Sequence, residues 1–556
     1  MRGARRSSRR TGISGLGRTV TVVAGTAALA LAATACSGGG GGGGSNSGNG
    51  VVTAWWGDPQ NPLIPTDTNE VNGGAVLDMI FTGLKVYDPK TAQPVNAMAE
   101  SITTQDQQHF TIKIKPNWKF SDGTPVTAHS FVDAWNWGSF AGNKQNNTDP
   151  FFTPIQGYTD VHPESGAPKA RTMSGLHVVD DHTFTVALTH KFSTWPDTLG
   201  YSAFAPLPKA FFANPNKWEQ KPIGNGPYVI DSWTKGQQMK LSPNPDYIGD
   251  QKPKNKGILL KVYTDANASY ADLQSGNLDV DNNLPSSALA TAKNDLHGRF
   301  INAPAGILQT IGFPLYDKAW NTPAAAKVRE GIGMAIDRAT ITNKIFHNTR
   351  VPASDWTAPI LGAQGGYKPG LCGGACTYNP TEAKKLIDGN GGIPGGQLTI
   401  AYNADADHKV WVDAVCNSIN NVLGNSHACV GKPVGTFADF RNQIVAKSMT
   451  GAFRSGWQMD YPLIQDFIQP IYETGAASND YSYSSHQVDS LINQANAAPS
   501  RAETVTKYQQ AESQIDKDLP TIPLWYQNGL AGYSANVSNV LLDPFSVPVY
   551  WEIEKH

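Results

Sequence analysis

The sequence predicts an α/β protein built of more than one lobe, and three observations lead to this prediction. Strand-like and helix-like patterns alternate along most of the chain, and strands return near its end. The length of 556 residues is more than one compact core accommodates and suggests about two to four domains. No sequence repeat with a period of about 20 to 50 residues is visible, so a repeat array is not expected.

The first half of the chain contains mainly strand patterns around one clear helix. Residues 51–56 and 109–115 alternate apolar and polar side chains, as half-buried strands do. After the turn FSDGTP, Thr127 caps an amphipathic helix in which Phe131 and Trp135 share one face. Three further segments have strand patterns: residues 181–188, 224–233 and 257–263.

The second half is richer in helices. Pro323 follows Thr322 and suits the first turn of a helix that continues to Asp337, where a second helix begins. The other helical patterns cover residues 381–387, 408–423, 436–449 and 486–518, the last divided into two helices at Pro499. The strand patterns among them cover residues 397–403, 451–457, 521–527 and 547–553.

The N-terminus has the features of an export signal. Residues 1–35 combine an arginine-rich leader with an apolar run that starts at Val20. This run is too short to span a membrane and is typical of a signal peptide. Whether export uses the general or the twin-arginine route stays open at this point, because arginine pairs arise by chance in such leaders.

The segment after the signal peptide predicts a membrane anchor. Residues 33–35 before Cys36 resemble the lipidation motif of bacterial lipoproteins, although Ala33 stands where Leu is usual. We therefore expect a lipid on Cys36; a secretory peptide with an incidental cysteine is the alternative. The glycine-rich residues 36–50 have almost no side chains to bury and are expected to form a flexible tether.

Charge and cysteine content narrow the class further. A net charge of −2, from 44 basic and 46 acidic residues, gives no strong positive field, so we expect no nucleic-acid partner.

Besides Cys36, an even number of cysteines in an oxidising compartment favours disulfides. The simplest pairing joins Cys372 to Cys376 and Cys416 to Cys429, although other connectivities are possible. A four-thiolate zinc site is the alternative, with a spacing that matches no usual zinc signature.

The sequence lacks the common signatures of catalysis. It contains no G-x-S-x-G, H-E-x-x-H, G-x-x-x-x-G-K or EF-hand motif, and GNGPY lacks the third glycine of a dinucleotide-binding fingerprint. None of the 12 histidines pairs with another at metal-ligand spacing. We therefore expect no enzyme activity, no cofactor and no metal.

Residues 453–462, FRSGWQMDYP, place a basic and an acidic group on one short aromatic segment. If residues 451–457 form a strand, Arg454 and Asp460 lie at most about 20 Å apart and can bind the two ends of a zwitterion. A free peptide has such ends, and each must be paired when it leaves water. Gly456 would let a ligand backbone approach the strand edge. The alternative is that both charges are surface groups or pair with protein neighbours.

Several sequence blocks together resemble one protein family. These blocks are WKFSDGTPVTAHSFVDAW at 118–135, GNGPYVI at 224–230, NPDYIGD at 244–250, YADLQSGNLDV at 270–280, KVREGIGMAIDR at 327–338 and YNPTEAKKLI at 378–387. In type and order they resemble the family 5 extracellular solute-binding proteins, which include the oligopeptide- and dipeptide-binding lipoproteins of ABC importers. Each block alone is weak, but together they span nearly the whole chain after the tether.

The resemblance implies a two-lobe fold of the periplasmic-binding-protein type, with an extra subdomain and a hinged ligand cleft. On this template lobe I is discontinuous and comprises residues 51–90, 200–305 and 523–556. Residues 91–199 form the extra subdomain, and residues 306–522 form lobe II. The template also implies delivery of the ligand to permease subunits in the membrane.

The resemblance also implies roles for particular residues. The peptide-binding members have an R-x-G-W-x-x-D-Y segment, which this chain matches from Arg454 to Tyr461. By similarity Asp460 binds the ligand's α-ammonium, Gly456 and Trp457 offer backbone pairing, and Arg454 lies where an arginine contacts the ligand's carboxylate. Residues 69–71, with Val71, are expected to form a second ligand-pairing strand.

The sequence thus predicts a monomeric, lipid-anchored receptor outside the cytoplasmic membrane that captures short peptides for an ABC importer. One alternative keeps the fold but binds a non-peptide solute such as a glycoside, a metal chelate or an antibiotic. A ligand without a cation would leave Asp460 unpaired. The other alternative is a cell-surface hydrolase or an envelope assembly factor.

Overall fold

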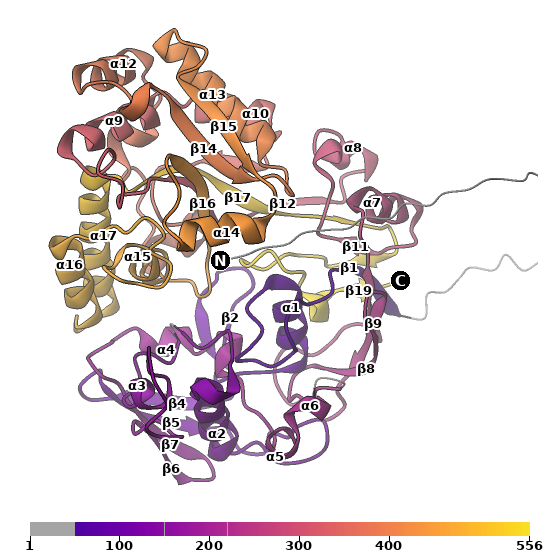
Figure 1. Cartoon of the computed structure of the whole chain (residues 1–556). Coiled ribbons are helices and arrows are strands. Elements are labelled where there is room, and N and C mark those ends of the chain that lie inside the picture. Colours follow the sequence, from indigo (N-terminus) through magenta and orange to yellow (C-terminus); the bar gives the residue numbers. More distant parts are fainter. Residues whose placement is uncertain (1–49, 150, 219–220) are drawn as a thin grey trace, which may run out of the picture. The chain divides into compact units, whose positions relative to one another are not determined.

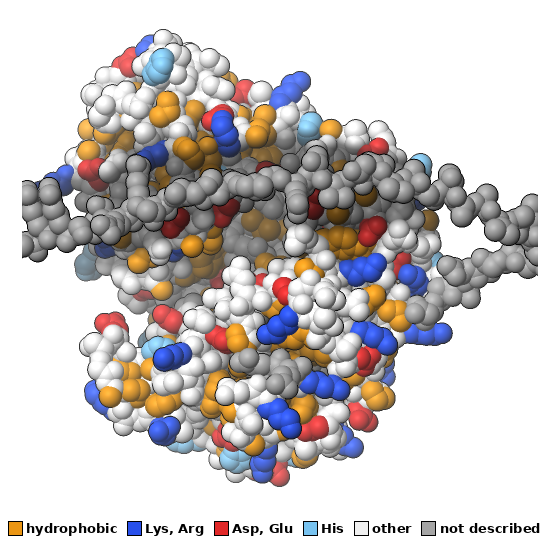
Figure 2. All heavy atoms as spheres, turned by 45° about the vertical axis from the view of Figure 1, so that its right-hand side comes forward, with side chains coloured by type: hydrophobic (Ala, Val, Ile, Leu, Met, Phe, Trp, Pro, Cys, Tyr) orange, Lys and Arg blue, Asp and Glu red, His pale blue; other side chains and the backbone are white. Residues whose placement is uncertain are grey.

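The structure is a computed structural model that describes residues 50–149, 151–218 and 221–556 (Figure 1). The predicted signal peptide, the lipidation site Cys36 and the tether up to residue 49 lie outside the described residues. Within the described ranges no helix combines the length and the apolar composition that a membrane crossing requires. On the face drawn in Figure 2, basic and acidic side chains lie side by side over the described residues.

A mixed sheet of eleven strands runs through the described part of the chain, in the order β15-β14-β16-β12-β17-β11-β1-β10-β9-β8, with β13 also pairing with β17. Its strands are β1 (Val51–Trp56), β8 (Tyr228–Thr234), β9 (Gln238–Pro243), β10 (Gly257–Val262), β11 (Val280–Asp281), β12 (Phe300–Gly312), β13 (Arg350–Pro352), β14 (Leu398–Asn403), β15 (Cys429–Val434), β16 (Ala452–Gln458) and β17 (Thr521–Tyr533). In β1 half-buried and buried residues alternate, as the sequence pattern predicts.

The long strands β12 and β17 connect two lobes. They pair antiparallel along almost their whole length, with shifts in register between Pro304 and Ile307 and between Gln309 and Thr310. On one side of the first irregularity lie β1 and β8–β11, which we assign to lobe I. On the other side lie β13–β16, which we assign to lobe II. The predicted α/β class with two lobes is therefore confirmed.

A second sheet belongs to the part of the chain predicted as the extra subdomain. Its order is β4-β5-β7-β6, all antiparallel, with β4 (Ala99–Thr104), β5 (His109–Ile114), β6 (Leu176–Asp180) and β7 (Thr183–Ala187). Helix α2 (Ala128–Ser139) packs on this sheet through fully buried Phe131 and Trp135, whose rings contact Phe184. The cap at Thr127 is the one that the sequence predicts. A hairpin of β2 (Lys85–Tyr87) and β3 (Pro94–Asn96) precedes this sheet in the chain.

Helices cover lobe II. They are α9 (Pro323–Met334), α10 (Arg338–Lys344), α11 (Gly362–Gly365), α12 (Pro380–Gly389), α13 (Lys409–Leu423), α14 (Phe437–Val445), α15 (Ile464–Tyr472), α16 (His486–Asn496) and α17 (Arg501–Asp518). The side chains of Thr322, Asp337 and Thr436 cap α9, α10 and α14 by accepting backbone hydrogen bonds. These helix starts agree with the sequence prediction because capping depends on side chains next to the helix in the chain.

The helices outside lobe II are short apart from α1, α2 and α7. They are α1 (Val71–Ile80), α3 (Tyr158–Val161), α4 (Trp195–Thr198), α5 (Lys209–Ala213), α6 (Pro215–Trp218), α7 (Ala266–Ser275) and α8 (Ala292–Asp295). Two short strands near the C-terminus, β18 (Val537–Ser538) and β19 (Glu554–Lys555), pair with each other.

The strand predicted over residues 547–553 is wrong. The chain there forms a 3-10 turn at Tyr550–Glu552. The side-chain amide of Asn255 donates to the carbonyl oxygens of Tyr550 (2.8 Å) and Ile553 (3.0 Å). A distant buried side chain therefore bends this segment, although its own pattern is that of a strand.

Lobe II contains the two disulfides of the described residues. Cys372 is bonded to Cys376, and Cys416 in α13 is bonded to Cys429 at the start of β15. This is the simplest of the pairings that the sequence allows. The zinc alternative is wrong, because all four thiols are used in these bonds.

Removing the bond between Cys416 and Cys429 is expected to destabilise the protein more than removing the other. The bonded residues are separated by 13 positions in this pair and by 4 in the other. The entropy of loop closure predicts about 3 kcal/mol for the longer loop and about 2 kcal/mol for the shorter. Urea unfolding of the two double variants, each with both cysteines changed to Ala, measures the difference. An equal or reversed order would contradict the entropic account.

Candidate functional site

Strand β16 has a free edge along most of its length. It pairs with β12 from Phe453 to Gln458, but its pairing with β14 involves only Ala452 and Phe453. Among the described residues, positions 454–458 therefore have no strand partner on the β14 side. Such an edge offers backbone donors and acceptors to an extended ligand.

Gly456 lies in the middle of this edge and is exposed. A Cβ atom there would lie 2.6 Å from the carbonyl oxygen of Leu308 in β12. From the sequence, this glycine is expected to let a ligand backbone approach the strand. In the structure, the close approach of β12 already requires it.

Asp460 lies two residues beyond the end of β16 and is half-buried. Its backbone amide donates to Oδ2 of Asp466 at 3.0 Å. Among the described residues, no protein donor reaches the Asp460 carboxylate, and burial raises its pKa to about 7. The carboxylate lines a cavity of about 250 Å³. This side chain is therefore available to a cationic group that enters the cavity.

Asp466, in the first turn of α15, positions the segment before it. Its side chain is 1% exposed and its Oδ2 also accepts a hydrogen bond of 3.0 Å from the indole Nε1 of Trp457. Burial and the neighbouring Asp460 raise the pKa of Asp466 well above its usual value. The role of Asp466 is not predictable from the sequence, since an acidic residue in the first turn of a helix is ordinary.

The cavity beside Asp460 lies between the lobes. Lobe II contributes Gln458, Met459 and Asp460, and the other walls include the start of α1, Tyr87, Tyr201 and Phe545. Its charged side chains are all acidic: Glu70, Asp78 and Asp460. Asp78 is exposed to solvent on helix α1. The cavity is therefore suited to a ligand that carries positive charge.

The second ligand-pairing strand predicted at residues 69–71 is wrong. Val71 is the first residue of helix α1, and the Glu70 carboxylate caps that helix by accepting from the amides of Asn72 (2.8 Å) and Gly73 (2.7 Å). Asn69, Glu70 and Val71 nevertheless line the cavity beside Asp460. These residues line the cavity through the N-terminus of a helix rather than through a strand.

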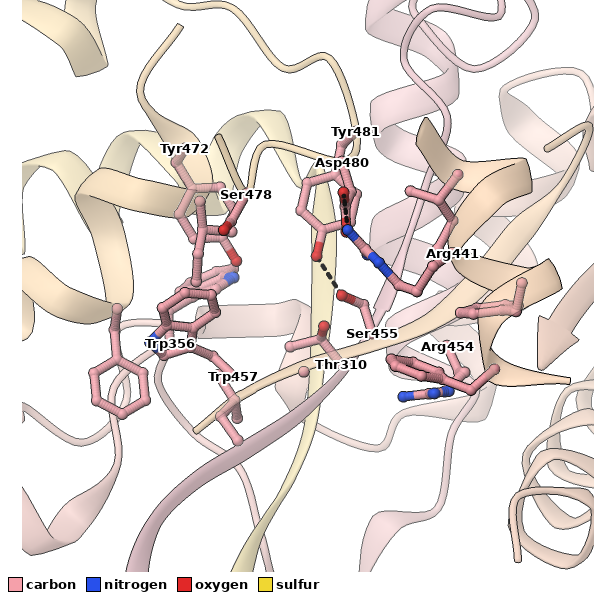
Figure 3. A pocket seen from close by; sticks show the side chains of 17 residues that line it. Thr310, Trp356, Arg441, Arg454, Ser455, Trp457, Tyr472, Ser478, Asp480 and Tyr481 are labelled. Carbon is pink, nitrogen blue, oxygen red and sulfur yellow. Dashed lines mark hydrogen bonds and ion pairs between the residues drawn. The ribbon is translucent and has the colours of Figure 1, made fainter. Parts of the chain in front are cut away.

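Arg454 faces a different cavity, of about 220 Å³ and within lobe II (Figure 3). Its guanidinium lies about 5 Å from the ring centres of Phe437 and Phe440, and its Nε donates to Oδ1 of Asn403 at 2.8 Å. Burial lowers its pKa to about 10, which leaves it charged at neutral pH. Arg454 and Asp460 thus face separate cavities, and the structure does not bring their side chains together around one small ligand.

The other walls of the Arg454 cavity are aromatic, aliphatic and hydroxyl side chains together with Arg441 and Asp480. Figure 3 shows Arg441 directed at Asp480, its partner in an ion pair, and Tyr481 directed at Ser455. Gly456 and Trp457 also line this cavity. The free edge of β16 therefore runs along one cavity with a cation and ends at another with carboxylates.

The described residues contain no group of three or more His, Cys, Asp or Glu side chains placed to bind a metal. The acidic side chains of the interlobe cavity, Glu70, Asp78 and Asp460, therefore do not form such a group.

Comparison with known proteins identifies the chain's relatives. Residues 93–479, more than half of the chain, match the model of the bacterial extracellular solute-binding proteins, family 5. The periplasmic oligopeptide-binding protein OppA of Salmonella typhimurium is 27% identical over 463 residues, which cover 80% of this chain and 81% of that protein. The periplasmic murein peptide-binding protein MppA of Escherichia coli is 24% identical over 490 residues, which cover 83% and 86%.

Solved structures share the fold. The Escherichia coli murein tripeptide-binding protein MppA has a TM-score of 0.74 at 20% identity, covering 91% of this chain and 98% of that chain. The Haemophilus influenzae OppA, in complex with RPPGFSPFR, has a TM-score of 0.73 at 20% identity, covering 91% and 99%. The two lobes, the interlobe cavity and the family match together show that this chain belongs to family 5 of the bacterial extracellular solute-binding proteins.

Proposed function

We propose that this protein captures short peptides outside the cytoplasmic membrane and presents them to the permease of an ABC importer. The observation that carries this proposal is the Asp460 carboxylate, which lines an interlobe cavity without a protein donor among the described residues. A peptide's α-ammonium supplies the missing charge. The relatives named as oligopeptide- and murein peptide-binding proteins support a peptide as ligand.

The free edge of β16 would bind the peptide backbone. Gly456 and Trp457 lie on this edge, so an extended peptide can add to the sheet while its amino end meets Asp460. Val71 would contact the same end from lobe I. Arg454 lies toward the other end of the edge, where it would attract the peptide's carboxylate.

The domain division supports capture by closure of two lobes. We propose lobe I as residues 51–90, 200–305 and 523–556, the extra subdomain as 91–199, and lobe II as 306–522. The pairing of β17 suggests one adjustment: residues up to Gln527 pair with β12 beyond its first irregularity, so the return crossing lies near Asn528. Rotation about β12 and β17 would open and close the cavity.

Lipid on Cys36 and a glycine-rich tether would hold the monomeric protein next to its permease. This role needs no catalysis, because the ligand is delivered unchanged.

A non-peptide solute stays the alternative, but the acidic walls of the cavity require that it carry a cation. Mass spectrometry of the ligand that co-purifies with the protein tests the proposal directly. Recovery of a neutral or anionic non-peptide solute would overturn it.

The variant Asp460→Asn is expected to weaken binding of trialanine by roughly 2 to 5 kcal/mol, because the buried ammonium loses its counter-charge. Calorimetry measures the affinity. Asp78→Asn is the matched control, since it makes the same change in the same cavity. We expect a smaller loss there; equal losses would mean that the general field of the cavity, and not contact with Asp460, binds the ammonium.

Acetylation of the ligand's amino group tests the same contact from the other side. N-acetyl-trialanine has no ammonium, so it would leave the Asp460 carboxylate buried and unpaired. We expect calorimetry to give an affinity at least about tenfold weaker than for trialanine, a difference of about 1.4 kcal/mol. Equal affinities would place a different part of the ligand at Asp460.

Binding is also expected to depend on pH. The free Asp460 carboxyl has a pKa raised to about 7, so below this pH it carries a proton and lacks the charge that the ammonium needs. Affinity should therefore fall, by up to about tenfold per pH unit, as pH decreases from about 7.5 to about 5.5. Calorimetry across this range measures the fall, which Asp460→Asn should largely abolish. A wild-type affinity that is constant or rises toward low pH would contradict the assignment.

A further inference from the structure

A second set of contacts joins the lobes away from the ligand cavity. Helix α4 carries Asp197, whose carboxylate forms an ion pair with Arg501 at the first position of α17. Nε of Arg501 also donates to the carbonyl oxygen of Gln364 at 2.9 Å. Trp195 of α4 packs on Phe110 of the four-stranded sheet, so α4 belongs to the extra subdomain, whereas α17 belongs to lobe II.

Ser193 adds two hydrogen bonds across the same contact. Its amide donates to the carbonyl oxygen of Asn496 at 3.2 Å, and its hydroxyl lies 3.0 Å from the hydroxyl of Thr504. Thr504 is fully buried. We call Ser193, Asp197, Arg501 and Thr504 the latch.

The ion pair of the latch is well shielded from water. The side chains of Asp197 and Arg501 are 15% and 27% exposed. Ion pairs at this depth are screened less by salt than fully exposed ones, and breaking one leaves charge that must be hydrated again. Lys85, which lies with Asp197 on the lobe I side, also attracts the Asp197 carboxylate. When the lobes separate, Asp197 loses Arg501 but keeps Lys85 as a cationic neighbour. Because its charge stays partly compensated, the latch is able to open.

The latch is connected to a wall of the ligand cavity. The hydroxyl of Tyr87 donates to the backbone oxygen of Asp197 at 3.0 Å. Tyr87 lines the interlobe cavity with Asp460, and its ring packs on Phe545, with 5.4 Å between the ring centres. Asp197, which forms the ion pair with lobe II, is thus hydrogen-bonded to Tyr87, a side chain that lines the ligand cavity.

We propose that Arg501 is a positioning residue for ligand capture: through its ion pair with Asp197 it stabilises the closed arrangement of the lobes and slows release of the ligand. The latch residues do not line the cavities beside Asp460 or Arg454. They therefore act on the equilibrium between open and closed lobes, and a ligand that binds across the lobes gains affinity from any contact that favours closure. The nature of the ligand rests on the proposed function, but the latch itself does not.

The variant Arg501→Gln removes the charge of the latch. We expect trialanine to dissociate about tenfold faster from it than from the wild type, with little change in the association rate. Stopped-flow fluorescence measures both rates. Lys507→Gln is the matched control: it removes a charge from the same helix, but its amine bonds Gln494 within lobe II. Unchanged dissociation in Arg501→Gln, or an equal change in the control, would overturn the proposal.

The variant Arg501→Lys separates the charge of the latch from the packing of the arginine side chain. It keeps a cation on the side chain that faces Asp197 but lacks the planar guanidinium, so trialanine should dissociate from it at a rate between those of the wild type and Arg501→Gln. If Arg501→Lys and Arg501→Gln release trialanine equally fast, the loss does not arise from the charge and the proposal fails.

Small-angle scattering tests the latch without any peptide. The radius of gyration of purified Arg501→Gln is expected to exceed that of the wild type, because the open arrangement becomes more populated. An unchanged radius would overturn the latch. Failure of the wild type to bind any peptide would instead overturn the proposed function and leave this comparison valid.

Discussion

The geometry of the site depends on one buried carboxyl group, that of Asp466. It accepts hydrogen bonds from the Trp457 indole and from the Asp460 amide, and so joins the end of β16 to the first turn of α15. A carboxyl group that is 1% exposed requires such donors, because burial without them costs several kcal/mol. Since these bonds fix the backbone at residue 460, they also fix the direction in which the Asp460 carboxylate points.

The two charged residues of the FRSGWQMDYP segment have very different environments. Arg454 already has protein partners in Asn403 and two aromatic rings. Asp460 has no donor on its carboxylate among the described residues, and its raised pKa reflects that cost. A cationic ligand therefore relieves an unfavourable state at Asp460, whereas at Arg454 a ligand competes with contacts that the fold already makes. This asymmetry makes Asp460 the stronger determinant of what is bound.

Local chemistry explains why much of the fold could be predicted. The caps at Thr127, Thr322 and Thr436 and the strand at β16 follow from neighbouring residues, and so do the starts of the three helices. The errors arise where a distant or competing group acts. Asn255 bends residues 547–553, and the Glu70 carboxylate caps a helix where a strand was expected. The Asn255 contact leaves no signal in the spacing of residues 547–553, and the Glu70 cap is local but uses a residue that is not among the usual N-caps.

The sequence by itself determined the α/β class, the family, the pairing partners available to its cysteines and the position of Asp460 just beyond a strand. These properties reside in short stretches or in their order. Only the tertiary structure decided that Arg454 and Asp460 face separate cavities, that Asp78 and Tyr87 share the cavity of Asp460, and that Arg501 meets Asp197 across the lobes. The physical reason is that burial and charge pairing depend on which side chains meet in space. Side chains that meet, such as Asp197 and Arg501, can be separated by hundreds of positions in the chain.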